Sequence, residues 1–441
     1  RLTSRRSREL GHTATTIPTT LAVLGHLNRS YGRLRWSTLV EPAVRIAEYG
    51  YRITPLQSRL QARERNGFLK APSRSGARYF LKNGTTPYRS GEHFAQHDLA
   101  ATLSEVASDG IEAFYRGNIG QRIDADMKRH RGLLRAEDLA LLPEVIEREA
   151  LVDTYRGLTV HTFPPPGAGH TLLLILKMME HFPAGRLSDG TPDSHRLLAE
   201  IQRLALIENR ENPLNPHTFH QLRPWREHTG KRAESLAGLI HQGSSPQSRS
   251  HVSGHDRGET THLSVMDGAG NVAAITQSVN LVYGAKAAAD GLGFLYNSYI
   301  EAFQYGQPAH YYNLRPNGIP WSSVAPAIVS FDGEPWLVAG SPGSQRGFSA
   351  TAQFLSAIID GALPLSDAMA RPRLYSKVNG ELNIEAGRFD PAVLAHLEHA
   401  GYPIRQRSDY SFFLGAVHAV LRCRTRDEYQ GIADIRRDGT A

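Results

Sequence analysis

The chain has 441 residues, of which 40% are hydrophobic and 21% charged, as in an ordinary globular protein with a large core. Its net charge of +7 at pH 7 does not indicate nucleic-acid binding, because the basic residues are scattered and short clusters such as 128–131 carry no interleaved aromatic residues. A single cysteine, Cys423, excludes an internal disulfide and a cysteine-based metal site, and no apolar run is long enough to span a membrane.

The N-terminus is basic and lacks the apolar region of a signal peptide. Because the chain begins at Arg1 rather than Met, we expect a further segment upstream, which could include a signal peptide. The compartment therefore stays open.

Apolar residues at three- and four-residue spacing predict a largely helical first half. The clearest amphipathic helix covers 194–205. A strand at 158–163 ends at Pro164 and leads into a tight turn at 167–169, which lacks the lysine and spacing of a phosphate-binding loop. Further helices are expected around 21–27, 39–47, 100–106, 123–127 and 137–139.

The most informative feature is the junction at Thr260. Residues 243–258 are Gly, Ser, His and charged residues with almost nothing apolar, which predicts a mobile linker. Thr260 follows at the head of a predicted hairpin, 261–266 and 272–279. If the bond to Glu259 is cut, Thr260 becomes a nucleophile whose own α-amine, with a pKa of about 7.7–8.0, acts as the base. A loop before a Thr-rich strand is also common without such chemistry, so the motif alone leaves both interpretations open.

The second half of the chain is rich in predicted strands. A strand pair at 327–331 and 336–340 flanks a turn, and helices are expected at 348–359 and 391–399. Strands before and around helices in this order favour a layered α+β arrangement. We expect one interwoven domain that is cut in two.

Motifs in order along nearly the whole chain resemble those of the gamma-glutamyltranspeptidase family of N-terminal nucleophile hydrolases. They are Gly11-His12 with Pro18, 113–117, 164–166, 195–206, 260–262, Asn271, Asn280, 321–326, 340–343, 370–373, 433–434 and 436–439. The resemblance implies an α+β fold of four layers, an αββα sandwich, built from a large part at 1–259 and a small part at 260–441.

The resemblance also implies the chemistry. The precursor would cleave itself between Glu259 and Thr260, and Thr260 would then attack a γ-glutamyl amide, such as that of glutathione. Water or an acceptor amine would resolve the acyl-enzyme. Backbone N–H groups at Gly343 and Ser344 would form the oxyanion hole, where the family has two glycines, and Ser278 would position the nucleophile. No cofactor or metal is implied.

Other matched residues would hold the substrate. Asn280 matches a ligand of the α-amino group, and Ser322 and Ser323 match hydroxyls that hold the α-carboxylate. Each alone could be an ordinary strand or turn residue, but their family order and spacing favour binding.

Three departures from the family are visible. The family's carboxylate-binding Arg lies upstream of Arg1. Tyr299 and Ala302 replace the family's Gln and Asp for the α-ammonium. Tyr299 and the neighbouring Glu301 are therefore candidate substrate-binding residues, although a one-position shift is expected to turn Glu301 to the other side. These changes predict weak recognition of the ammonium group. The segment 304–320 is shorter than the family's lid loop, which predicts an open cleft.

The leading hypothesis is thus a γ-glutamyl hydrolase or transferase with a Thr nucleophile. The alternatives are an acylase acting on a non-glutamyl amide of the glutaryl type, or an inactive remnant that has lost its N-terminal segment. The expected partners are a small amide, water or an acceptor amine, and the two pieces of the precursor, with neither nucleic acid nor membrane. The oligomeric state is left open.

Overall fold

The computed structural model of the protein describes residues 4–141, 145–219, 225–243, 258–426 and 428–441. The linker predicted for 243–258 lies outside the described residues except at its two ends.

The chain divides into two compact units. Unit 1 comprises Arg1–Glu147 and Ser278–Tyr305, and unit 2 comprises Arg148–Gln277 and Gly306–Ala441. Each unit therefore contains residues from both sides of Thr260. The single interwoven domain expected from the sequence stays a prediction.

Unit 1 is mostly helical. In α8 the residues Ile119, Ile123 and Met127 recur every four positions, so they share one face of the helix, and all three are fully buried against Phe114 and Tyr115. The helices are α1 (Arg5–Glu9), η1 (His12–Ala14), α2 (Thr20–Tyr31), α3 (Trp36–Tyr49), α4 (Pro55–Lys70), α5 (Ser75–Phe80), α6 (His97–Asp109), α7 (Ile111–Tyr115), α8 (Asn118–Arg129), α9 (Ala136–Ala140) and η3 (Tyr299–Ala302), with short strands β1 (Tyr51–Arg52) and β2 (His93–Phe94).

Unit 2 is built on a six-stranded antiparallel sheet with the order β13-β12-β8-β7-β4-β3. A smaller sheet has the order β11-β10-β9. The strands are β3 (Leu151–Tyr155), β4 (Leu158–Thr162), β5 (Gly258–Met266), β7 (Ala327–Phe331), β8 (Glu334–Gly340), β9 (Leu374–Ser376), β10 (Leu382–Glu385), β11 (Ile404–Arg407), β12 (His418–Arg422) and β13 (Tyr429–Ala433). The helices are α10 (Gly169–Glu180), α11 (Ala184–Ser188), α12 (Pro192–Glu211), α13 (Trp225–His241), α14 (Gln345–Ile359), α15 (Leu365–Ala370), η4 (Ala386–Arg388), α16 (Pro391–His399) and η5 (Phe412–Leu414).

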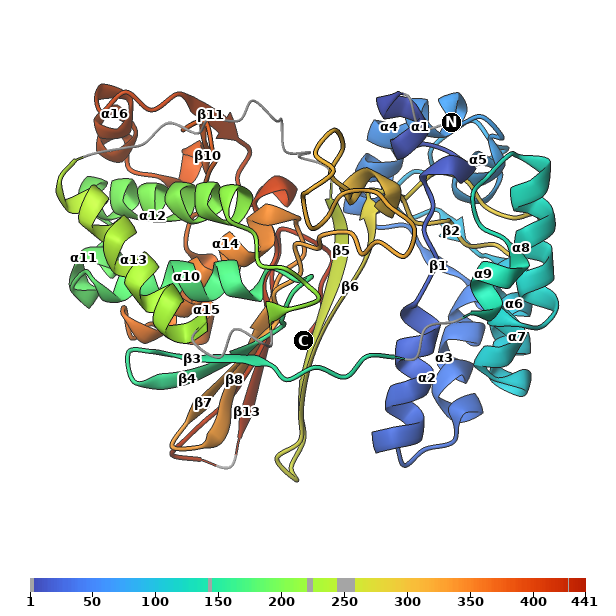
Figure 1. Ribbon diagram of the computed structural model, residues 1–441, viewed down its shortest axis with the longest axis horizontal. Helices are drawn as coiled ribbons and strands as arrows, with labels where there is room; N and C mark the ends of the chain where they lie inside the picture. The colour runs from blue at the N-terminus through green and yellow to red at the C-terminus, as the bar shows by residue number, and fades with distance from the viewer. Residues whose placement is uncertain (1–3, 142–144, 220–224, 244–257, 427) are drawn as a thin grey trace. The chain divides into compact units, whose positions relative to one another are not determined.

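The two faces of the large sheet have different neighbours, as the alternation along β8 shows. Leu337 and Ala339 are fully buried in a core shared with α10, α12 and α14. The next residue, Gly340, faces the other way, because a Cβ built on it would lie 2.3 Å from the Cε1 atom of His262 in β5. Helices therefore cover one face of the sheet, and β5 lies against the other (Figure 1).

Strand β5 pairs with β6 (Val272–Leu281), which runs from unit 2 into unit 1. The carboxylate of Asp267 closes the turn by accepting from the backbone N–H groups of Ala269 and Asn271, each at 2.9 Å. The predicted hairpin is thus confirmed, as are the other predicted helices and strands, with boundaries that differ by up to six residues. Among the described residues, no helix is both long and apolar enough to cross a membrane.

Candidate active site

Thr260 is the third residue of β5 and is 8% exposed. The bond between Glu259 and Thr260 therefore lies within a strand. The Nη1 atom of Arg437 donates to the Thr260 carbonyl oxygen at 3.3 Å, and the Arg437 guanidinium lies 3.9 Å from the centroid of the Phe412 ring. The C-terminal segment thus holds the backbone of the predicted nucleophile.

His262 shares a strand face with Thr260, two residues away, and is a candidate for a side-chain base. Its ring nitrogens lie 2.7 Å from Thr276 Oγ1 and 2.9 Å from Ser264 Oγ. Burial, with a smaller contribution from His418, lowers the pKa of His262 to about 3. A neutral ring that is engaged through both nitrogens is a structural group, which leaves the α-amine of Thr260 as the base that the predicted chemistry needs.

The predicted oxyanion donors lie against the start of β5. A Cβ built on Gly258 would be 2.8 Å from Ser344 Cβ and 3.2 Å from Ser344 N. Ser344 is the N-cap of α14, and within the described part of the chain neither its backbone N–H nor that of Gly343 donates to a protein acceptor. Because a helix N-terminus presents unpaired N–H groups and a partial positive charge, this peptide is suited to a developing oxyanion.

The backbone of these two donors is strained in a way that suits glycine. Gly343 has φ 128°, and a Cβ on it would lie 3.0 Å from Gly415 Cα. Ser344 has φ 59° and ψ −141°, close to a region that only glycine adopts readily. This backbone conformation explains why the family has a glycine at the second position. In this chain a serine adopts it.

Ser278, Asn280 and Glu301 come together in unit 1. Ser278 Oγ accepts from the Asn280 backbone N–H at 2.9 Å. The Asn280 side-chain amide donates to the Ser298 carbonyl at 3.0 Å and to Glu301 Oε2 at 2.9 Å. A carboxylate thus lies beside the residue that matches the family's ammonium ligand.

The expectation that Glu301 faces away from this group was wrong. That expectation assumed the alternating side chains of a strand or a tight turn. Residues 299–302 instead form the 3-10 helix η3, in which successive side chains turn by about 120°. This rotation brings the Glu301 carboxylate to Asn280. Tyr299 is partly exposed and begins η3, with its N–H donating to Asn297 Oδ1 at 3.0 Å.

Ser322 and Ser323 precede β7 in unit 2 and are both partly exposed. The Ser322 N–H donates to the Pro166 carbonyl at 2.9 Å, so the segment follows the turn between β4 and α10. Within the described residues neither hydroxyl has a protein partner, which leaves both able to donate to an anion.

The structure therefore groups the sequence-predicted residues by unit. Thr260 shares unit 2 with Gly343, Ser344, Ser322 and Ser323, whereas Ser278, Asn280, Tyr299 and Glu301 belong to unit 1. The motif at 436–439 contains Arg437, but the sequence predicts no role for it, because a contact to a residue 177 positions away has no local signal.

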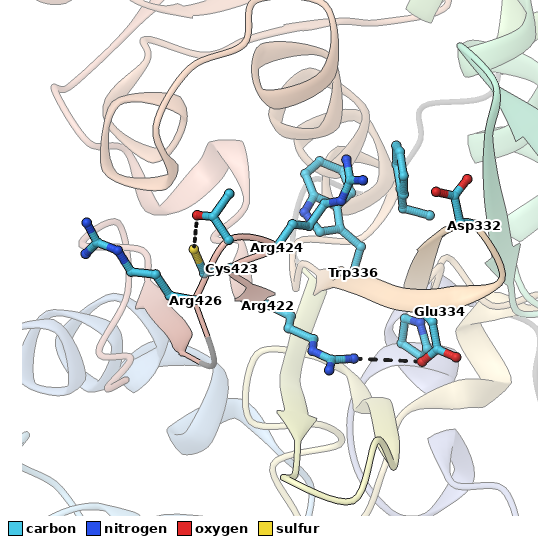
Figure 2. A pocket seen from close by; sticks show the side chains of 10 residues that line it. Asp332, Glu334, Trp336, Arg422, Cys423, Arg424 and Arg426 are labelled. Atoms are coloured by element: carbon cyan, nitrogen blue, oxygen red, sulfur yellow. Dashed lines mark hydrogen bonds and ion pairs between the residues drawn. The ribbon is translucent and has the colours of Figure 1, made fainter.

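Unit 2 also has a surface hollow at the far end of β8, lined by side chains from the β7–β8 turn and the β12–β13 connection (Figure 2). Arg424 lies 3.3 Å from the centroid of the Phe331 ring, and Arg422 pairs with Glu334 at 3.8 Å. Because β8 runs seven residues from Glu334 to Gly340, about 20 Å separates this hollow from the turn that leads to Ser344. The hollow is thus distinct from the predicted site of amide chemistry.

A family model described as gamma-glutamyltranspeptidase matches residues 2–441. The glutathione hydrolase proenzyme of Escherichia coli (strain K12) is 30% identical over 410 residues, which cover 89% of this chain and 70% of that protein. The acylase ACY 1 proenzyme of Pseudomonas sp. (strain SE83) is 28% identical over 384 residues, covering 87% of this chain and 68% of the relative.

The solved structures agree on the fold. The crystal structure of cephalosporin acylase from Bacillus halodurans matches with a TM-score of 0.86 and 24% identity, covering 98% of this chain and 78% of that one. The chain therefore has the α+β fold of N-terminal nucleophile hydrolases, as predicted.

Proposed function

Because the chain belongs to the gamma-glutamyltranspeptidase family, we propose that it is an amidohydrolase or acyltransferase whose nucleophile is Thr260, released by self-cleavage. The observation that carries the proposal is the Gly343–Ser344 peptide, which lies at the N-terminus of α14 and against the start of the strand that bears Thr260. A nucleophile and a pair of oxyanion donors are the two parts that acyl transfer requires.

Self-cleavage uses the Thr260 hydroxyl. The Oγ atom attacks the carbonyl carbon of Glu259, the C–N bond breaks, and the nitrogen takes up a proton to become the α-amine of Thr260. Water then cleaves the resulting ester, which leaves a Glu259 carboxylate and restores the hydroxyl. The contact from Arg437 to the Thr260 carbonyl supports this step, because it fixes the backbone on one side of the bond to be cut.

Turnover uses the same atoms. The α-amine accepts the proton of the Thr260 hydroxyl as Oγ attacks the substrate amide, and the Gly343 and Ser344 N–H groups stabilise the oxyanion. The proton passes to the departing amine, and the acyl group remains as an ester on Thr260. Water or an acceptor amine attacks that ester and regenerates the enzyme.

For the acyl group we propose a γ-glutamyl type. The pairing of Asn280 with Glu301 supports this choice, because a carboxylate beside an amide oxygen offers an α-ammonium both an anion and a neutral acceptor. Glutaryl-type amides remain the alternative, because one of the relatives is named an acylase rather than a glutathione hydrolase. The free hydroxyls of Ser322 and Ser323 suit the α-carboxylate of a γ-glutamyl donor. A glutaryl donor has a terminal carboxylate at the same position, so these hydroxyls suit both kinds of substrate.

The proposal is tested with the wild type and the variants Thr260→Ala and Thr260→Ser. A denaturing gel should show two bands for the wild type, and the smaller piece should begin with Thr260-Thr261-His262. Thr260→Ala should give one uncut band and no hydrolysis of a γ-glutamyl anilide, because it lacks the hydroxyl used in both steps. Thr260→Ser keeps a hydroxyl and should still cut. A Thr260→Ala protein that cuts at this bond would overturn the assignment.

A further inference from the structure

Three metal-ligating side chains converge in unit 1, apart from the residues proposed for amide chemistry. His12 lies in η1, Asp126 in the last turn of α8, and His130 at the C-cap of the same helix. One ligand atom from each lies within 4.8 Å of the others. The spacing of four residues between Asp126 and His130 places both on one face of α8, toward His12.

The distances within this cluster lie close to those between ligands of one ion, although His12 and Asp126 are at hydrogen-bond distance. His12 Nε2 lies 2.8 Å from Asp126 Oδ2, and His130 Nε2 lies 3.5 Å from Asp126 Oδ1. Zinc binds nitrogen and carboxylate oxygen at about 2.0–2.2 Å, which separates neighbouring ligand atoms by about 3.0–3.5 Å. Small side-chain rotations therefore suffice to place all three atoms around one cation. The two imidazole rings already stack, with centroids 4.4 Å apart.

The residues around this cluster bury two of its side chains and hold its carboxylate in place. The side chains of His12 and Asp126 are 1% and 7% exposed, whereas that of His130 is 30% exposed and opens a path to solvent. Tyr296 donates its hydroxyl to Asp126 Oδ2 at 3.0 Å, and its ring lies edge-on to His12 with centroids 5.5 Å apart. A hydrogen bond of this kind, from a residue that is not itself a ligand, orients a ligating carboxylate.

We propose that His12, Asp126 and His130 bind one divalent transition-metal ion of the zinc class, with water completing the coordination. Two imidazoles and one carboxylate favour such an ion over calcium or magnesium, which prefer oxygen ligands. The ion would join the N-terminal segment to α8, because His12 is remote from the other two ligands in sequence.

A bound ion would also stabilise the segment that leads to η3. Asn297 Oδ1 accepts from the Thr16 N–H at 3.1 Å and from the Tyr299 N–H at 3.0 Å. The Gly11 N–H, next to His12, donates to the Ala285 carbonyl at 2.8 Å. The segment that contains His12 is thus hydrogen-bonded to Ala285 and to Asn297. Fixing His12 therefore limits the movement of this segment and of the residues that lead to η3. The proposed role is structural.

The test uses the full-length protein after chelator treatment and buffer exchange. Titration with Co²⁺ should give visible d–d absorption that saturates at one ion per chain, and Zn²⁺ should abolish it by displacement. Saturating Zn²⁺ should raise the Tm by roughly 2–6 °C, since it binds only the folded state.

The variant His130→Asn tests the ligands. His130 is partly exposed, so His130→Asn should remain folded by circular dichroism while its Co²⁺ affinity falls at least 100-fold. The control is His26→Asn. It removes a partly exposed histidine whose Nε2 lies 2.7 Å from Glu147 Oε1, and it should leave the saturating site unchanged.

Two results would overturn the proposal: unchanged Co²⁺ binding in folded His130→Asn, or no saturable binding in the wild type. Neither result bears on the Thr260 chemistry, because self-cleavage and anilide hydrolysis are measured separately and need no metal.

Discussion

The Asn280 side-chain amide donates both to the Ser298 carbonyl and to the Glu301 carboxylate, at 3.0 Å and 2.9 Å. With both amide hydrogens engaged, the Asn280 carbonyl oxygen is directed away from these partners and can accept from a cation. The premise for weak ammonium recognition, a missing carboxylate, therefore does not hold. Strong recognition of the α-ammonium becomes the expected behaviour.

Glu301→Gln should separate the two candidate substrates. The change keeps the size of the side chain and an acceptor for Asn280, but it removes the negative charge. Because hydrogen bonds to charged groups contribute about 1.5–3 kcal/mol, kcat/KM for a γ-glutamyl anilide should fall about 10- to 100-fold. The value for the matched glutaryl anilide, which lacks only the amine, should change less than threefold. Equal losses on both substrates would mean that Glu301 has only a structural role.

Ser344→Gly and Gly343→Ala should have opposite effects. Glycine adopts the φ of 59° at Ser344 without strain, so Ser344→Gly should raise the free energy of unfolding by about 1 kcal/mol and keep activity. Alanine at 343 would bring its Cβ to 3.0 Å from Gly415 Cα and distort the donor peptide. Urea unfolding and anilide hydrolysis measure the two effects. If Gly343→Ala leaves kcat unchanged, this peptide is not the oxyanion hole.

The sequence predicted the regular elements well, because helices and strands follow from the spacing of apolar residues. Residues 194–205 and the 261–279 hairpin show this directly. The orientation of Glu301 could not be predicted, since it depends on a single turn of 3-10 helix that has no periodic signal. The contacts from Arg437 to Thr260 and from His12 to Asp126 join residues far apart in the chain, and only the folded structure brings them together.

Acid stability should depend on His262. Its folded pKa of about 3 lies below the usual 6.5, so between these values the unfolded chain binds the proton and the folded protein does not. Stability is therefore complete above about pH 6.5 and falls as the pH drops toward 3. In Thr260→Ala, which stays uncut, protonation of His262 should lower the free energy of unfolding by on the order of 2–3 kcal/mol between pH 7 and 4. Adding His262→Asn should abolish this decrease. If the urea midpoints of Thr260→Ala with and without His262→Asn change with pH in the same way, the acid dependence does not come from His262.

Ser278→Ala should lower kcat about 10²-fold and leave KM nearly unchanged. Ser278 Oγ accepts from the Asn280 N–H at 2.9 Å, and the same hydroxyl carries an O–H. That O–H is expected, from the family match, to position the nucleophile and so to act mainly in the transition state. Ser278→Thr keeps the hydroxyl and should recover part of the rate. If Ser278→Ala instead raises KM for the γ-glutamyl anilide at constant kcat, the hydroxyl serves only to hold Asn280 in its turn.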